Sequence, residues 1–242
     1  MDEYLFNLKG NIVLLGIQNI KKKRVIKYFI DAAARIAKEE GISRITIRKV
    51  AAEAGYNSAT LYNYFNSIED LLDFAIINSI TDYLNEIYKI LISDKHEVLK
   101  YFESWKCYCK YSFTYPSIYT YAFASRFSEN VLNKMNTYFE MFPEAFSNIN
   151  ISQKALKLIL TSGLNERDSA FIRPCIECGY FNEKDAIDIN IMAYMLHGGL
   201  MYSLENSRYP ISIQESIQQF SKYYIEYMNW KRTEGYPPIE KL

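Results

Sequence analysis

The sequence predicts an all-α protein with an N-terminal domain of three helices and a larger helical domain behind it. Apolar residues make up 49% of the 242 residues, so the chain can bury a sizeable core. Only nine glycines and six prolines interrupt it. Apolar residues recur with the 3.6-residue period of helices, and beyond residue 80 no stretch alternates long enough to predict a strand.

The first helix is predicted over residues 24–40. Phe29 and Ile30 share one face with further apolar residues, and charged residues occupy the opposite face. Gly41 is expected to end this helix because glycine adopts a positive φ at low cost. Thr46 then offers a hydroxyl as N-cap to a second helix of about two turns.

The third helix is predicted over residues 58–65, with Gly55 ending the helix before it and Asn57 as its N-cap. Only Leu61 and Phe65 face its predicted core. A longer helix followed by two short helices around a glycine turn is the helix-turn-helix arrangement.

The rest of the chain also reads as helices. Ser67 with Asp70 three residues later predicts a capping box that opens a fourth helix. The last two helices, over 183–205 and 212–230, are the longest of those that follow. The predicted domains are an N-terminal extension over 1–20, a helix-turn-helix domain over 21–68, and a ligand-binding and dimerisation domain over 69–242.

Charge is distributed unevenly along the chain. Lysine and arginine balance aspartate and glutamate at 28 each, so the formal net charge is zero. Residues 21–66 nevertheless hold ten basic and four acidic residues. A basic block attached to a more acidic body is typical of a head that binds a polyanion.

The polar face of the third helix suits the major groove of double-stranded DNA. Small residues begin this face and polar or aromatic residues follow, which suits a groove about 12 Å wide. The tyrosine hydroxyls and the helix start could bind phosphates, and an arginine on the second helix could read a guanine edge. The candidate DNA-binding residues from this argument are Arg48, Asn57, Ser58, Ala59, Thr60, Tyr62, Asn63 and Tyr64.

Residues 32–76 closely resemble the N-terminal domain of the TetR/AcrR transcriptional regulators. The resemblance lies in Gly41-Ile-x-x-Ile-Thr-Ile-Arg-Lys-Val-Ala, in Thr60-Leu-Tyr-x-Tyr-Phe65 and in Glu69-Asp-Leu-Leu72. It implies that Arg48 and the third-helix residues face DNA, and that Thr46 binds a phosphate.

Two positions depart from the family's pattern. Ile68 stands where the family often has a phosphate-binding lysine, and Tyr64 replaces a common histidine. The basic run over 21–24 could supply phosphate contacts instead, or it could be a solvated arm.

The resemblance also implies a homodimer. In this family the last two long helices usually pair with their twofold mates, so 183–205 and 212–230 are the expected dimer surface. Gly198 and Gly199 could allow close helix approach there, or they could serve a contact or bend within the helix.

Aromatic residues are dense between residues 101 and 146 and could line a pocket for a small hydrophobic or aromatic effector. The same residues could equally pack as plain core. The candidate ligand-binding residues are Trp105, Tyr108, Tyr111 and Phe123.

The sequence favours no catalytic residue, metal or cofactor. Cys175-x-x-Cys178 lacks a second pair of metal-binding spacing, because Cys107 and Cys109 would point apart on one helix. No stretch is apolar enough to span a membrane, and a cytoplasmic location is expected.

The resulting hypothesis is a ligand-responsive repressor rather than an enzyme. A homodimer would place two third helices in successive major grooves of an operator, and the effector would release it. The alternative is a DNA-binding architectural or cell-cycle protein of the same fold without an effector.

Overall fold

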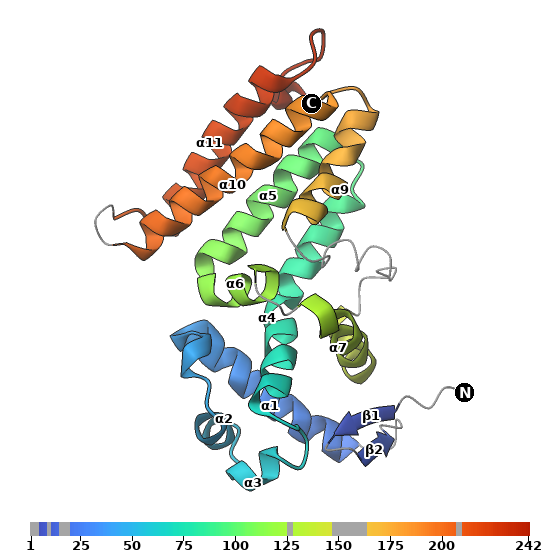
Figure 1. The fold of residues 1–242 in the computed structure, drawn as a ribbon, viewed down its shortest axis with the longest axis vertical. Coiled ribbons are helices and arrows are strands. Elements are labelled where there is room, and N and C mark those ends of the chain that lie inside the picture. Colours follow the sequence, from blue (N-terminus) through green and yellow to red (C-terminus); the bar gives the residue numbers. More distant parts are fainter. Residues whose placement is uncertain (1–4, 9–10, 15–19, 125–127, 147–163, 207–209) are drawn as a thin grey trace. The chain divides into compact units, whose positions relative to one another are not determined.

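The structure, a computed structural model, describes residues 5–8, 11–14, 20–124, 128–146, 164–206 and 210–242 (Figure 1). These residues belong to two compact units. The first unit spans Met1–Asp82 and Ser117–Asn150, and the second spans Tyr83–Pro116 and Ile151–Leu242. No helix among the described residues is long and apolar enough to cross a membrane.

The first unit begins with an antiparallel hairpin of β1 (Leu5–Leu8) and β2 (Asn11–Leu14), in which Leu5 pairs with Leu14. Four residues are too few for an alternating pattern to be recognised, and no strand was predicted there. The helices that follow are α1 (Ile20–Glu40), α2 (Ile47–Glu53), α3 (Ser58–Leu61), the start of α4 (Ile68–Leu91), α6 (Pro116–Ala124) and α7 (Ser128–Met141).

The predicted N-caps of the two short helices and the predicted glycine after the first helix are confirmed. Thr46 Oγ1 accepts a hydrogen bond from the Lys49 N–H at 3.2 Å and so caps α2. Asn57 Oδ1 accepts one from the Thr60 N–H at 2.8 Å and caps α3. Gly41 lies at φ 91°, where a side chain would be strained.

The third helix is shorter than predicted, because α-helical structure ends at Leu61 rather than at Phe65. The Asn63 N–H donates to the Thr60 carbonyl at 3.1 Å, and the Tyr64 N–H donates to the Leu61 carbonyl at 3.0 Å. Bonds between residues three apart wind the chain more tightly than an α-helix does. The segment therefore continues as tight turns that still bring Phe65 into the core.

The core of the first unit holds the helix-turn-helix segment together. Phe29, Val50, Leu61 and Phe65 are each at most 1% exposed. Phe65 meets Phe29 edge to face, with ring centroids 6.3 Å apart. Burying each such side chain contributes about 1.5–3 kcal/mol, so this cluster fixes α1, α2 and α3 against one another.

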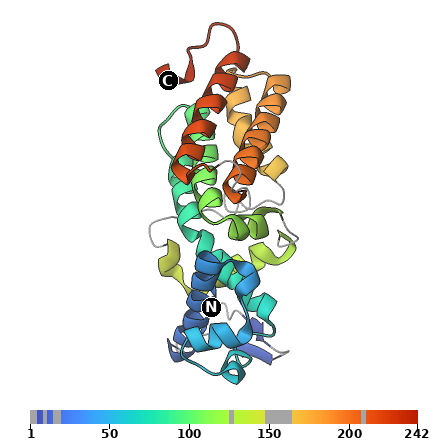
Figure 2. The same cartoon turned by 90° about the vertical axis from the view of Figure 1, so that its left-hand side faces the viewer.

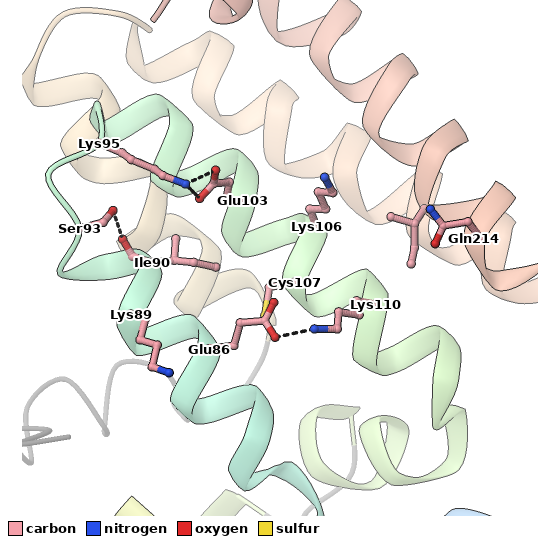
Figure 3. A pocket seen from close by; sticks show the side chains of 11 residues that line it. Glu86, Lys89, Ile90, Ser93, Lys95, Glu103, Lys106, Cys107, Lys110 and Gln214 are labelled. Atoms are coloured by element: carbon pink, nitrogen blue, oxygen red, sulfur yellow. Dashed lines mark hydrogen bonds and ion pairs between the residues drawn. The ribbon is translucent and has the colours of Figure 1, made fainter. Parts of the chain in front are cut away.

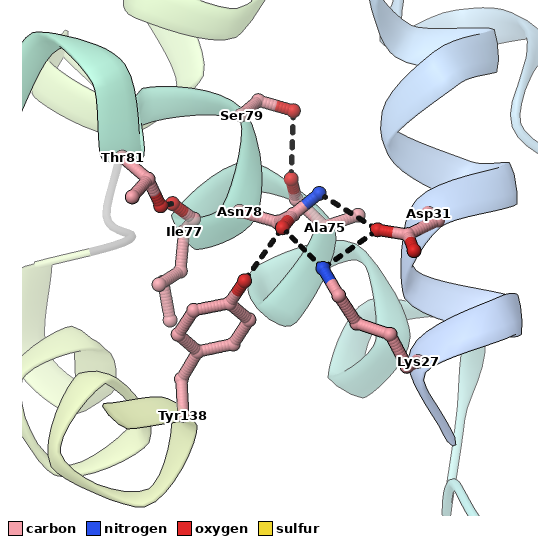
Figure 4. Close-up of polar contacts among 8 residues, drawn as sticks. All are labelled: Lys27, Asp31, Ala75, Ile77, Asn78, Ser79, Thr81 and Tyr138. Atoms are coloured by element: carbon pink, nitrogen blue, oxygen red, sulfur yellow. Dashed lines mark hydrogen bonds and ion pairs between the residues drawn. The ribbon is translucent and has the colours of Figure 1, made fainter. Parts of the chain in front are cut away.

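Polar contacts join α1, α4 and α7 (Figure 4). The Lys27 ammonium donates to Asp31 Oδ1 at 2.8 Å and to Asn78 Oδ1 at 3.0 Å. The Tyr138 hydroxyl donates to the same Asn78 oxygen at 2.5 Å. Because Tyr138 lies on α7 and Lys27 on α1, Asn78 on α4 connects the head to a helix outside the helix-turn-helix segment.

A second polar cluster lies between α4 and α7. The Lys134 ammonium donates to Asp70 Oδ1 at 2.9 Å and to Asp73 Oδ2 at 2.5 Å. The Tyr121 hydroxyl on α6 also donates to Asp73, at 3.0 Å. Burial lowers the pKa of Lys134, but its hydrogen bonds to the two carboxylates outweigh this effect and raise the pKa above its ordinary value.

Replacing Lys134 with methionine is expected to lower the free energy of unfolding by about 1–3 kcal/mol at neutral pH, because two partly buried carboxylates lose their cation. The raised pKa of Lys134 means that its contribution is complete below pH 10.5 and is lost as the pH rises through the folded-state pKa. Urea denaturation checks this, with Lys134→Arg as the control that keeps the charge. Equal stability of wild type and Lys134→Met would show that the cluster contributes nothing.

The second unit contains the rest of α4 together with α5 (Glu97–Thr114), α9 (Leu164–Glu177), α10 (Glu183–Glu205) and α11 (Ile213–Lys231). The long helices predicted over 183–205 and 212–230 are thus confirmed. Ser212 forms a capping box with Glu215 at the start of α11.

A chain of buried polar groups joins the helices of the second unit. The Tyr224 hydroxyl donates to the Tyr101 hydroxyl at 2.8 Å, and the Tyr101 hydroxyl donates to Asn190 Oδ1. The Trp105 indole N–H donates to the same tyrosine oxygen at 3.2 Å. Satisfied buried polar groups favour one specific packing arrangement, so this network fixes α5 against α10 and α11.

Candidate nucleic-acid interface

The exposed face of the helix-turn-helix segment contains the predicted DNA-binding residues. Thr46, Arg48, Asn57, Ala59 and Asn63 are exposed. Ser58, Thr60 and Tyr64 are half-buried, and Tyr62 is 37% exposed. This face is therefore accessible to solvent from the start of α2 to the turns after α3.

Two of these residues also build the local structure. Besides capping the backbone, Asn57 Oδ1 accepts a hydrogen bond from the Thr60 hydroxyl at 3.0 Å. The Tyr64 ring lies 6.3 Å from that of Phe29, so part of it packs on the core. These contacts fix the side chains before any ligand binds, which lowers the entropy cost of binding.

Ion pairs within the head occupy some of its basic residues. Lys27 pairs with Asp31, Arg35 pairs with Glu53 at 3.2 Å, and Lys49 pairs with Glu40. Three of the four acidic residues of the basic block are thereby matched.

Two exposed arginines remain available on this face. Within the described part of the chain, neither Arg44 nor Arg48 has an ion-pair partner, and both are exposed. Arg44 was not predicted as a contact, since nothing in the sequence distinguished it from lysines and arginines that pair internally. An unpaired guanidinium is suited to bind a phosphate or a guanine edge.

The predicted ligand-binding aromatics lie in two different places. Trp105 and Tyr108 on α5 are 2% and 4% exposed and pack against other rings, such as Phe220 and His197. The Tyr111 hydroxyl donates to Glu86 Oε2 at 3.0 Å. Phe123 belongs to α6 in the first unit.

Phe123 stacks on Tyr119 with ring centroids 5.7 Å apart. Packing of this kind is compatible with plain core and with the wall of a pocket. The ligand-binding role of the four aromatics therefore stays a prediction.

An apolar stripe runs along the outside of the helix pair α10 and α11, which lie side by side in both views (Figures 1 and 2). On α10 it comprises Ile187, Ile191, Met195 and Tyr202, which are 52–66% exposed. Their spacing of three to four residues or multiples places them on one helix face. Trp230 on α11 is 73% exposed. Exposed apolar surface of this kind is typical of an interaction site.

Gly198 lies on the same face of α10 between Met195 and Tyr202. A Cβ added at Gly198 or Gly199 would meet nothing within 4 Å, so packing within the protomer does not require glycine at either position. A glycine inside a helix costs about 1 kcal/mol relative to alanine. Because glycine has no side chain, another helix could approach the backbone of α10 closely at this point.

The four cysteines are thiols without a described metal site. Cys107, Cys109 and Cys175 are buried, and the Cys178 thiol donates to the Cys175 carbonyl at 3.4 Å. Burial raises the pKa of the Cys175 thiol. Among the residues that the structure describes, no group of three or more histidine, cysteine, aspartate or glutamate side chains could hold a metal ion.

Comparisons with known proteins agree with this geometry. Residues 29–74 match the family described as "Bacterial regulatory proteins, tetR family". No curated protein matches the chain.

Two solved structures share the fold. A TetR transcription regulator from Haloarcula marismortui is 16% identical over 86% of this chain and 98% of its own, with a TM-score of 0.53. The fatty acid degradation regulator FadR from Bacillus halodurans is 14% identical over 82% of this chain and 93% of its own, with a TM-score of 0.51.

A capped helix-turn-helix head with an exposed polar face, joined to a helical body, is the architecture typical of helix-turn-helix DNA-binding regulators. The predicted fold class is confirmed. The chain is similar to the TetR family over residues 29–74, and it shares the fold of the two solved regulators.

Proposed function

We propose that this protein is a sequence-specific transcriptional repressor that binds a DNA operator as a homodimer and leaves it when a small effector binds. The observation that carries the proposal is the exposed face of α2 and α3, where Arg48, Tyr62 and Asn63 are exposed and Asn57 caps the start of α3.

Residues on this face have two roles in the proposal. Arg48, Ala59, Thr60 and Asn63 enter the major groove and contact base edges. The others bind the phosphate backbone, which positions the head without reading sequence. The backbone-binding residues are Thr46, Asn57, Ser58, Tyr62 and Tyr64. The basic surplus of the head supplies sequence-independent attraction to DNA.

The dimer in this proposal uses the apolar stripe on α10 and α11. Ile191 and Met195 supply apolar area, and Gly198 lets the backbones approach. A twofold-symmetric pair of heads would bind half-sites about 34 Å apart, so the operator should be near-palindromic.

The effector in this proposal binds in the body of the protein and changes the population of DNA-competent conformations. The proposed location is the cytoplasm, where operator and effector meet.

Selection from a random DNA pool with the full-length protein tests the DNA-binding part. We expect enrichment of a near-palindromic sequence, and we expect the affinity for it to fall steeply as salt rises because lysines and arginines displace counterions. Enrichment of no sequence would contradict specific binding. A flat salt response would contradict the phosphate contacts.

A further inference from the structure

The second unit contains a half-open groove of about 570 Å³ between α4, α5 and the start of α11 (Figure 3). This volume lies within the range of 300–1,000 Å³ typical of small-molecule sites. The groove is not lined by the four aromatics predicted to bind an effector. The residues that line it combine a surplus of lysines with an apolar wall.

Lysines dominate the polar lining. Four lysines line the groove against two glutamates. Lys95 pairs with Glu103, with distances of 2.5 and 2.6 Å, and Lys110 on α5 donates to Glu86 on α4 at 2.6 Å. Within each pair, the positive charge of the lysine and the negative charge of the glutamate cancel.

The other two lysines carry the surplus charge. Lys89 on α4 and Lys106 on α5 are both exposed, and neither has an ion-pair partner within the described parts of the chain. The groove thus keeps two uncompensated positive charges in a concave surface. Concave surfaces lined by one sign of charge concentrate the field and attract ligands of the opposite sign.

Apolar groups form the remaining wall. Ile90 projects from α4, Cys107 from α5 and Ile217 from α11. Cys107 is 3% exposed and adds an apolar, polarisable surface. The Ser93 hydroxyl donates to the Ile90 carbonyl at 2.7 Å, which leaves its oxygen able to accept a hydrogen bond.

We propose that this groove binds a small organic anion with an apolar chain or ring, and that this ligand is the effector of the repressor. Its carboxylate or phosphate group is attracted by the surplus positive charge of Lys89 and Lys106, and its apolar part lies on Ile90 and Ile217. A neutral apolar ligand would leave both ammonium groups unmatched, and an inorganic anion would leave the apolar wall exposed. Only the effector role depends on the proposed function.

Isothermal titration of the full-length protein with dodecanoate tests the groove. We expect the Lys89→Gln/Lys106→Gln double variant to bind dodecanoate about tenfold more weakly or worse, since the groove loses its surplus positive charge. Lys241→Gln is the matched control, because Lys241 is an exposed lysine that does not line the groove. Its affinity should equal that of the wild type.

Two further tests separate the parts of the proposed ligand. Ile217→Asn should weaken dodecanoate binding without changing the charge of the groove. Dodecanol and inorganic phosphate should each bind much more weakly than dodecanoate. Competition between dodecyl phosphate and dodecanoate shows which of the two headgroups, phosphate or carboxylate, binds more tightly. Tight binding of either headgroup supports the proposal.

Dodecanoate binding that is absent, or equal in wild type, Lys89→Gln/Lys106→Gln and Ile217→Asn, would overturn the assignment of the groove. Circular dichroism confirms that each variant is folded. Binding that leaves operator affinity unchanged would overturn the effector role. Failure of the wild type to select any DNA, with dodecanoate binding intact, would instead count against the proposed function and leave the groove assigned.

Discussion

Replacing Met195 with glutamate is expected to convert the proposed homodimer to a monomer and to weaken operator binding by about a thousandfold. Met195 is 66% exposed at the centre of the apolar stripe on α10. Twofold symmetry would bring two copies of the new carboxylate into one interface, where each would lose its hydration without gaining a partner.

The large loss of operator affinity follows from the number of half-sites that a dimer or a monomer can bind. A dimer binds both halves of an operator in one event, because the second head is held close to its half-site by the first. A monomer loses this advantage although each head is unchanged. Sedimentation velocity measures the oligomeric state, and gel-shift titration of the selected operator measures the affinity.

The matched control for Met195→Glu is Gln218→Glu, which adds the same charge at an exposed residue on a different face of α11 from Trp230. It should remain dimeric with wild-type affinity for the operator. A Met195→Glu variant that stays dimeric would show that the stripe is not the interface. A monomer that binds the operator normally would show that dimerisation is not needed.

The local structure of the head could be predicted because short-range rules determine it. Thr46 and Asn57 cap α2 and α3 as expected, and Gly41 takes the positive φ that ends α1. Each of these features depends on residues within four positions along the chain. The predicted length of α3 was wrong because turns with hydrogen bonds between residues three apart follow Leu61, and the apolar period does not distinguish them from an α-helix.

Contacts between distant segments were beyond sequence reasoning. The groove brings Lys89 and Lys106 close to Ile217, a residue more than one hundred positions further along. Aromatic density pointed to α5, where Trp105 and Tyr108 pack against other rings instead of an open space. Periodicity predicts that a residue is buried, but it does not distinguish core packing from the wall of a cavity.

The charge pattern predicted a basic head but not which cations are available. Arg35 and Lys49 pair with acidic residues from other elements, whereas Arg48 has no such partner among the described residues. These side chains look alike in the sequence. Only the fold shows that Arg48 lies exposed on α2 with no ion-pair partner in the described ranges of the chain.

Replacing Arg48 with alanine is expected to weaken binding to the selected operator by about 1–3 kcal/mol, or roughly tenfold to a hundredfold, and to relax base preference at one position of each half-site. Arg48 is exposed near the start of α2, and its guanidinium can donate two parallel hydrogen bonds to a guanine. Repeating the selection with the variant measures the change in preference directly.

Two comparison variants distinguish base reading from simple attraction. Arg48→Lys keeps the charge but not the paired donors, so it should retain affinity for unrelated DNA while losing the same base preference. Tyr62→Phe removes a hydroxyl proposed to bind a phosphate, so it should weaken binding to all sequences by a similar factor. A uniform loss for Arg48→Ala, with preference unchanged, would place Arg48 on the backbone and leave base reading to α3.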